Sequence, residues 1–160
     1  MNKWLYFGFY LARLTIMVNN VNVSCYNGTP PQTENSNRKI AGGPVYNHED
    51  LAALLKNGEG MLLAWSKKCI NDLQKYELTL EDALELIQLA LQEGTFLGSE
   101  WCIQKPSGPW AACDAYRLYR SEWILHAHKD MRIEYYVKFA IAKTGVLILI
   151  ASCHPSEDRY

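Results

Sequence analysis

The chain has 160 residues, of which 49% are hydrophobic and 21% are charged, and its formal net charge is −1. These values fit one ordinary globular domain with a sizeable core, and they exclude nucleic-acid binding driven by overall charge. The charges are unevenly spread, because residues 77–100 hold six acidic and no basic side chains whereas residues 101–143 hold seven basic and four acidic ones. An anionic ligand would prefer one face of such a molecule, although a solvated charged surface is the more common cause of this bias.

The first 44 residues differ in composition from the rest of the chain. An apolar run that begins at Trp4 resembles the core of a signal peptide, but Arg13 interrupts it and it is too short to span a bilayer. We therefore expect residues 1–26 to form an accessory β or extended segment with no membrane contact. The alternative is that this run is an export signal. Residues 27–44 have the Gly, Pro, Asn and Ser content of a linker, which leaves residues 45–160 as the main domain.

Helices are expected at the start of the main domain. Asn47 can cap a first helix, the apolar segment 61–65 is typical of a short buried strand, and Ser66 can cap a second helix. Thr79 begins a third helix, with Asp82 near the capping-box position and apolar residues at helical spacing behind it.

Strands are expected after the helices, over residues 110–120, 132–143 and 146–153. The sequence Lys-Thr-Gly at 143–145 predicts a hairpin turn between the last two strands. Helices that precede an antiparallel sheet in the chain indicate an α+β fold, with the N-terminal helices packed on the sheet.

The strand that starts at residue 132 has two different faces. Its odd positions from Ile133 to Ile141 are apolar, whereas Tyr136 and Lys138 fall on the even, outward face. The next strand ends at His154, so these three side chains could converge on one cleft. The alternatives are a solvated sheet face for Tyr136 and Lys138, and a strand-end histidine bonded to backbone for His154.

Five cysteines occur in the chain, an odd number without a CxxC pair, so we expect reduced intracellular thiols. A zinc site is a weak alternative, because the spacing of its candidate ligands matches no standard pattern. These candidates are Cys102, Cys153, His154 and the pair His126 and His128.

Several short motifs follow one another in a familiar order between residues 48 and 154. The helical segment LTLEDALELIQLAL precedes a strand with Trp110, then Asp114-Ala115-Tyr116-Arg117, then Tyr136-Val137-Lys138, an apolar run, Ser152 and His154. In order and spacing this region resembles the RelE-like messenger-RNA endonuclease toxins, and among them the motility and quorum-sensing regulator (MqsR) toxin family. The resemblance implies a RelE-like α+β domain.

The same resemblance implies a metal-independent endoribonuclease that cleaves single-stranded mRNA in a toxin–antitoxin system. It would act in the cytoplasm without a cofactor, with a protein antitoxin as partner. A base deprotonates the ribose 2′-OH, which attacks phosphorus, while positive groups stabilise the developing charge and an acid protonates the departing 5′ oxygen. Tyr136 falls on the family's active tyrosine, His154 falls near its terminal catalytic lysine, and Lys138 would supply a positive charge to the phosphate.

Five further residues are candidates for binding the RNA: Arg117, Lys67, Lys68, Lys105 and Trp101. Lys67 and Lys68 lie in the first turn of an expected helix, where cations oppose the helix dipole and a bound phosphate would reverse that penalty. Lys105 is the candidate to replace a lysine of the family through a longer loop, and Trp101 could stack on an unpaired base. Solvated lysines and a core tryptophan are the alternatives.

A non-catalytic RNA- or protein-binding module that keeps the RelE-like fold is the second hypothesis for the function. Cys113 stands where the family has a glutamine, and residues 95–99 contain no counterpart of the family's catalytic lysine. A chain that lost both groups could retain the fold and bind without cutting.

Overall fold

The computed structural model describes residues 20–156 of the chain. Its α-helices are α2 (His48–Leu55), α3 (Lys67–Lys75) and α4 (Leu80–Glu93), and a short 3-10 helix, η1, covers Glu59–Met61. Its strands are β1 (Lys39–Ile40), β2 (Leu62–Ala64), β3 (Thr95–Ile103), β4 (Trp110–Ile124), β5 (Lys129–Ile141) and β6 (Ile148–Pro155).

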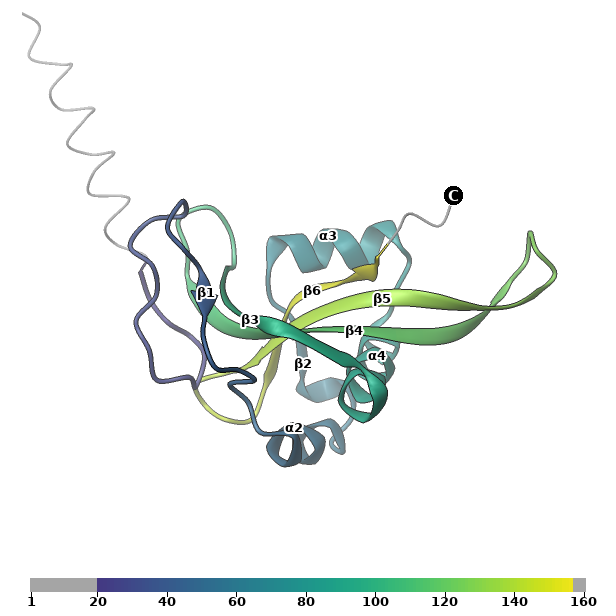
Figure 1. The fold of residues 1–160 in the computed structure, drawn as a ribbon, viewed down its shortest axis with the longest axis horizontal. Coiled ribbons are helices and arrows are strands. Elements are labelled where there is room, and N and C mark those ends of the chain that lie inside the picture. The colour runs from purple at the N-terminus through teal and green to yellow at the C-terminus, as the bar shows by residue number, and fades with distance from the viewer. Residues whose placement is uncertain (1–19, 157–160) are drawn as a thin grey trace, which may run out of the picture.

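The six strands form one sheet in the order β1-β3-β4-β5-β6-β2 (Figure 1). Neighbouring strands are antiparallel except β2 and β6, which are parallel. The predicted α+β class is therefore confirmed. The sequence did not indicate the parallel pair, because a strand of three residues carries no information about its direction of pairing.

Each of the three helices begins where the sequence predicted it. The side chains of Asn47 and Ser66 accept hydrogen bonds from backbone N–H groups in the first turns of α2 and α3. Thr79 and Asp82 form a reciprocal capping box at the start of α4. These caps satisfy backbone donors that would otherwise lack partners at the helix ends.

Strands β1 and β3 were not predicted from the sequence. The register of β3 against β4 shifts between Phe96 and Gly98, so Leu97 is an extra residue in a β-bulge. The bulge breaks the alternation of polar and apolar residues by which a strand is recognised. Strand β1 has only two residues and lies in a segment of linker composition.

The described part of the N-terminal segment is built into the sheet. The backbone N–H of Val23 donates to Trp110 at 2.8 Å, and that of Cys25 donates to Ile141 at 2.9 Å. Residues 27–44, expected to be a linker, contain β1, which pairs with β3. The domain boundaries remain predictions, and most of the segment 1–26 lies outside the described residues.

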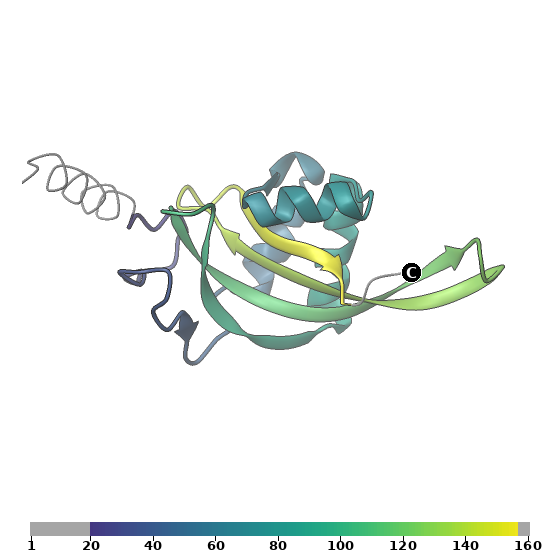
Figure 2. The ribbon, with the colours of Figure 1, turned by 90° about the horizontal axis from the view of Figure 1, so that it is seen from above.

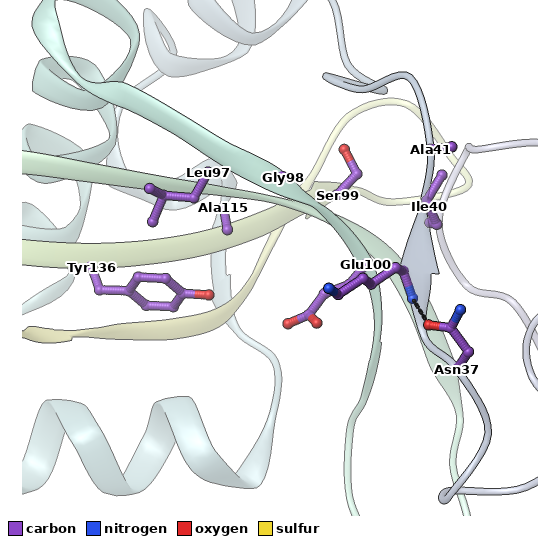
Figure 3. Close-up of a pocket in the computed structure, with 10 residues that line it drawn as sticks. Asn37, Ile40, Ala41, Leu97, Gly98, Ser99, Glu100, Ala115 and Tyr136 are labelled. Carbon is purple, nitrogen blue, oxygen red and sulfur yellow. Dashed lines mark hydrogen bonds between the residues drawn. The ribbon is translucent and has the colours of Figure 1, made fainter.

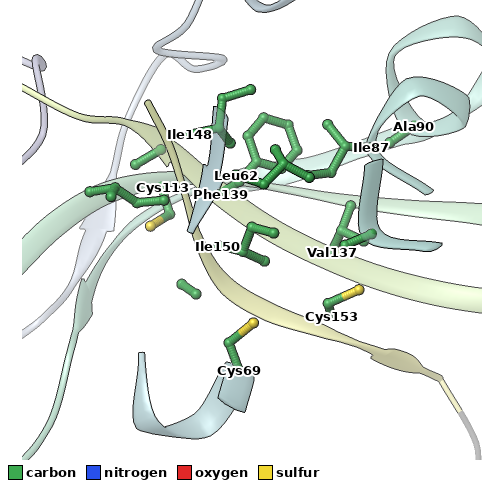
Figure 4. Close-up of a cluster of buried hydrophobic side chains, with 14 of the residues drawn as sticks. Leu62, Cys69, Ile87, Ala90, Cys113, Val137, Phe139, Ile148, Ile150 and Cys153 are labelled. Atoms are coloured by element: carbon green, nitrogen blue, oxygen red, sulfur yellow. The ribbon is translucent and has the colours of Figure 1, made fainter. Parts of the chain in front are cut away.

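One face of β5 belongs to the main hydrophobic core. Tyr135, Val137 and Phe139 are fully buried on this core face, together with Leu86 and Ile87 of α4. Figure 4 shows Ile87 and Ala90 on one side of the cluster, Cys69 of α3 on another, and Ile150 between them. A smaller core of Trp101, Trp110 and Ala112 lies near the N-terminal segment.

The sheet is strongly curled. The ends of β3 and β2 meet, although β4, β5 and β6 lie between them in the strand order. The N–H of Lys67, just after β2, donates to the carbonyl of Gln104, just after β3, at 2.9 Å. The Gln104 amide in turn donates to the carbonyl of Trp65 at 3.0 Å. The curl encloses part of the sheet surface that a flat sheet would leave in solvent.

Strands β4 and β5 continue beyond their neighbours as a two-stranded ribbon. Pairing of β4 with β3 ends at Arg117, and pairing of β5 with β6 begins at Tyr135. Figure 2 shows this ribbon extending away from the helices to its turn. Near the turn, Trp123 and Leu125 are 60% and 69% exposed. Within residues 20–156, no helix has the length and apolar character needed to cross a membrane.

Candidate functional site

Tyr136, Lys138 and His154 lie on the same face of the sheet, opposite to the core face. Tyr136 and Lys138 alternate with buried residues along β5, and Tyr136 is the direct cross-strand partner of His154 on β6. Their rings are 5.4 Å apart between centroids and tilted by 30°. The Lys138 Nζ lies 5.4 Å from the centre of the Tyr136 ring. We call this surface the site face.

Arg117 extends the site face on the other side of Tyr136. It is the direct partner of Tyr136 on β4, so the two side chains project to the same face. Its Nε lies 3.9 Å from Glu134 Oε2, and 44% of its side chain is exposed. A guanidinium held so loosely by one carboxylate remains available to an incoming anion.

Lys138 is the most enclosed cation of the site face. Its side chain is 12% exposed, and its ammonium group donates to Glu100 of β3 in an ion pair. Burial alone would lower the pKa of Lys138, but Cys102 and the hydrogen bond to Glu100 raise this pKa above its usual value. Lys138 therefore keeps its positive charge at neutral pH and cannot serve as a general base there.

The remaining two side chains differ in protonation chemistry. Burial raises the pKa of Tyr136, although Lys138 opposes this, so the phenol keeps its proton and can donate a hydrogen bond. A neutral imidazole has one nitrogen that donates a hydrogen bond and one that accepts. His154 Nδ1 lies 2.8 Å from the carbonyl oxygen of Pro155, so when Nδ1 donates to it, Nε2 is left as the proton acceptor.

The structure places the lysines predicted to bind RNA at the junction between β3 and α3. Lys67, Lys68 and Lys105 are all exposed there, and Lys67 donates its N–H to Gln104, the neighbour of Lys105. Lys68 forms an ion pair with Asp72 at 2.7 Å, one turn along α3. The junction therefore carries three lysines a few residues from Glu100 along β3.

Trp101 is a core residue in this structure. It is 6% exposed, and its ring packs edge-on against Tyr26 at a centroid distance of 5.8 Å. It alternates with Glu100 and Cys102 along β3, so it points away from the site face. The Trp101 ring therefore has no exposed face for the predicted stacking on an RNA base.

The cysteines and histidines considered for zinc do not come together. Within residues 20–156 no three His, Cys, Asp or Glu side chains are placed to hold a metal ion. His126 and His128 lie at the turn of the β4–β5 ribbon, far along the strands from Cys102 and Cys153. All five cysteines are free thiols, and Cys113, at the position of the family's glutamine, is fully buried.

Sequence reasoning missed Glu100, the carboxylate that pairs with Lys138. The two residues are 38 positions apart, and two strand pairings bring them together through β4. The available signal was weak: Glu100 stands between the buried residues Ser99 and Trp101, but the bulge at Leu97 and the glycine beside it interrupt the alternation of the strand.

Comparison of the chain with protein-family models, with curated proteins and with solved structures gives no match.

Proposed function

We propose that the chain is a RelE-like endoribonuclease that cleaves single-stranded RNA without a metal, at the site face of Tyr136, Lys138 and His154. The observation that carries the proposal is the cross-strand pair of Tyr136 and His154 beside the enclosed cation of Lys138. The proposal includes the toxin–antitoxin role, a cytoplasmic location and a protein antitoxin, as the resemblance to the MqsR toxin family implies.

These three side chains and Arg117 supply the base and the charge-stabilising groups for this reaction. His154 Nε2 takes the proton of the ribose 2′-OH, and the 2′ oxygen then forms a bond to phosphorus. Lys138 and Arg117 stabilise the negative charge on the phosphate oxygens, and the Tyr136 hydroxyl donates a hydrogen bond to one of them. The bond to the 5′ oxygen breaks, and this oxygen takes a proton from solvent. The products are a 2′,3′-cyclic phosphate and a 5′-hydroxyl end.

The ion pair between Lys138 and Glu100 favours the second hypothesis, a module that binds without cutting. A cation already neutralised by a carboxylate contributes less to a phosphate than a free one. For cleavage, the RNA phosphate must draw the Lys138 ammonium away from Glu100, whose side chain is 37% exposed and can be solvated. The two hypotheses therefore differ in whether Lys138 is available in the complex.

The test is incubation of the purified full chain with unstructured RNA in excess chelator, across a range of pH. We expect cyclic phosphate ends with and without chelator. Lys138→Met should lower the cleavage rate by about 10²-fold, the usual loss when one stabilising group is removed. Lys56→Met, which removes an exposed lysine that follows α2, is the matched control and should cleave like the unaltered chain.

Intact RNA at every pH, with a related toxin active in the same buffer, would exclude the endonuclease. Binding of the same RNA without cleavage would then support the module.

A further inference from the structure

A groove of about 500 Å³ opens directly beside the site face. One wall is β1 with Asn37 and Ala41 beside it, and the other is the stretch of β3 from Leu97 to Glu100. Tyr136 and Ala115 complete the lining. Figure 3 shows the Tyr136 ring at one end of the groove, with its hydroxyl directed toward the Glu100 side chain. Two residues of the groove, Tyr136 and Glu100, therefore also belong to the candidate site.

The wall formed by β1 is held firmly in place. Lys39 and Ile40 pair with Glu100 and Ser99, and the N–H of Trp101 donates to the carbonyl of Arg38 at 2.8 Å. Farther along, the buried carboxylate of Asp114 accepts the N–H groups of residues 45 and 46 at 3.0 and 3.1 Å. A wall anchored at both ends keeps the groove open without a ligand.

The lining combines apolar surface with polar groups at one end. The bulge in β3 leaves the Leu97 side chain 49% exposed at the groove, and Ala115 and the Tyr136 ring add apolar surface. Glu100, Asn37 and Lys39 supply a carboxylate, an amide and an ammonium group. A flat apolar body with hydrogen-bonding edges, the shape of a nucleobase, fits such a lining.

We propose that this groove binds the unpaired base of the nucleotide next to the cleaved phosphate. The inference rests on the proposed function, because Tyr136 would contact the phosphate through its hydroxyl while its ring borders the groove. Lys39 faces the same side as Glu100 by its register, so its ammonium group can meet the following phosphate of the strand. Strand β1 and the residues that flank it would then set which base is accepted beside the cut.

The test measures binding and cutting separately. Binding is followed by fluorescence anisotropy with a labelled DNA single strand, which lacks the 2′-OH and cannot be cleaved by this reaction. Cutting is followed with RNA of the same sequence. Leu97→Ala removes an apolar side chain from the wall formed by β3, and Ala41→Trp fills the groove from an exposed position beside β1. Each variant should weaken binding about tenfold, the size expected for one lost base contact, and should change the base preferred at the cut.

Ile70→Ala is the matched control, because Ile70 is a 43% exposed apolar residue of α3 outside the groove. Thermal midpoints equal to that of the unaltered chain show that the variants remain folded. If the unaltered chain cuts RNA and both groove variants bind and cut like the control, the groove proposal is wrong and the proposed function stands.

If the chain binds the DNA strand but never cuts RNA, cleavage is excluded and the groove is judged by the binding of the variants alone. Absence of both binding and cutting overturns the two proposals together.

Discussion

The two faces of β5 have different surroundings, although their residues alternate along one strand. On the core face, Tyr135, Val137 and Phe139 are fully buried. On the site face, Tyr136 and Lys138 are only partly buried and contact a histidine and a carboxylate instead of apolar side chains. The strand therefore holds the side chains of the candidate site in fixed positions, because the alternate residues anchor its backbone in the core.

Charged groups show the same division between the two faces. Arg120, which shares the core face by its position on β4, forms ion pairs with Asp82, Glu85 and Glu122 at 2.9, 3.3 and 3.2 Å. Among residues 20–156, Lys138 on the site face forms an ion pair with Glu100 alone. Arg120 is surrounded by three carboxylates and holds α4 against the sheet. Lys138 has a single carboxylate partner, which an anionic group of a ligand can replace.

The largest effect should come from the core face. Phe139→Ala removes a fully buried ring that stacks on Tyr116 at 5.7 Å, and should lower the free energy of unfolding by ~3–5 kcal/mol. Urea unfolding followed by circular dichroism measures this loss. Tyr136→Phe, the control on the site face of the same strand, should change the free energy by less than ~1 kcal/mol. Equal losses from both substitutions would show that the two faces do not differ in this way.

A smaller effect, on activity and not on stability, should come from His154. His154→Gln should leave the thermal midpoint nearly unchanged, because Ile148, Ile150 and Cys153 anchor β6 in the core. The rate of RNA cleavage should fall by ~10²-fold, the usual loss of a general base. Both quantities are measured on the same preparation. A variant that melts early while its folded fraction cleaves at the normal rate would make His154 a structural cap of the strand.

Local signals in the sequence were enough to predict some parts of the molecule, whereas other parts depend on residues far apart in the chain. A period of two placed Tyr136 and Lys138 on one face, and cap residues such as Asn47 and Thr79 marked the helix starts, because these signals are local. The groove and the partner of Lys138 could not be predicted in this way. They depend on a bulged strand, on a two-residue strand in a segment of linker composition, and on pairings between residues far apart in the chain.

The smallest expected effect concerns Asp82, which joins α4 to Arg120 on the core face. Burial would raise the pKa of Asp82, but the Thr79 N–H and the Arg120 guanidinium lower it below its usual value. A carboxyl whose pKa is depressed by folding adds stability above its unfolded pKa of about 3.9, and this contribution is lost as pH falls through the folded pKa. Asp82→Asn should therefore cost at most ~1 kcal/mol at neutral pH, since solvent screens this partly exposed pair.

The measurement is urea unfolding of the unaltered chain and of Asp82→Asn, from neutral pH down into the acid range. The difference between the two should start to shrink only below the unfolded pKa, as the pH falls toward the lower folded pKa of the carboxyl. Glu81→Gln, at an exposed position in the same first turn, is the control and should follow the unaltered chain more closely. A difference that stayed constant with pH would mean that Asp82 acts through its shape in the capping box and not through its charge. A change in the rate of RNA cleavage by Asp82→Asn would show instead that the ion pairs of the core face affect the site face through β5.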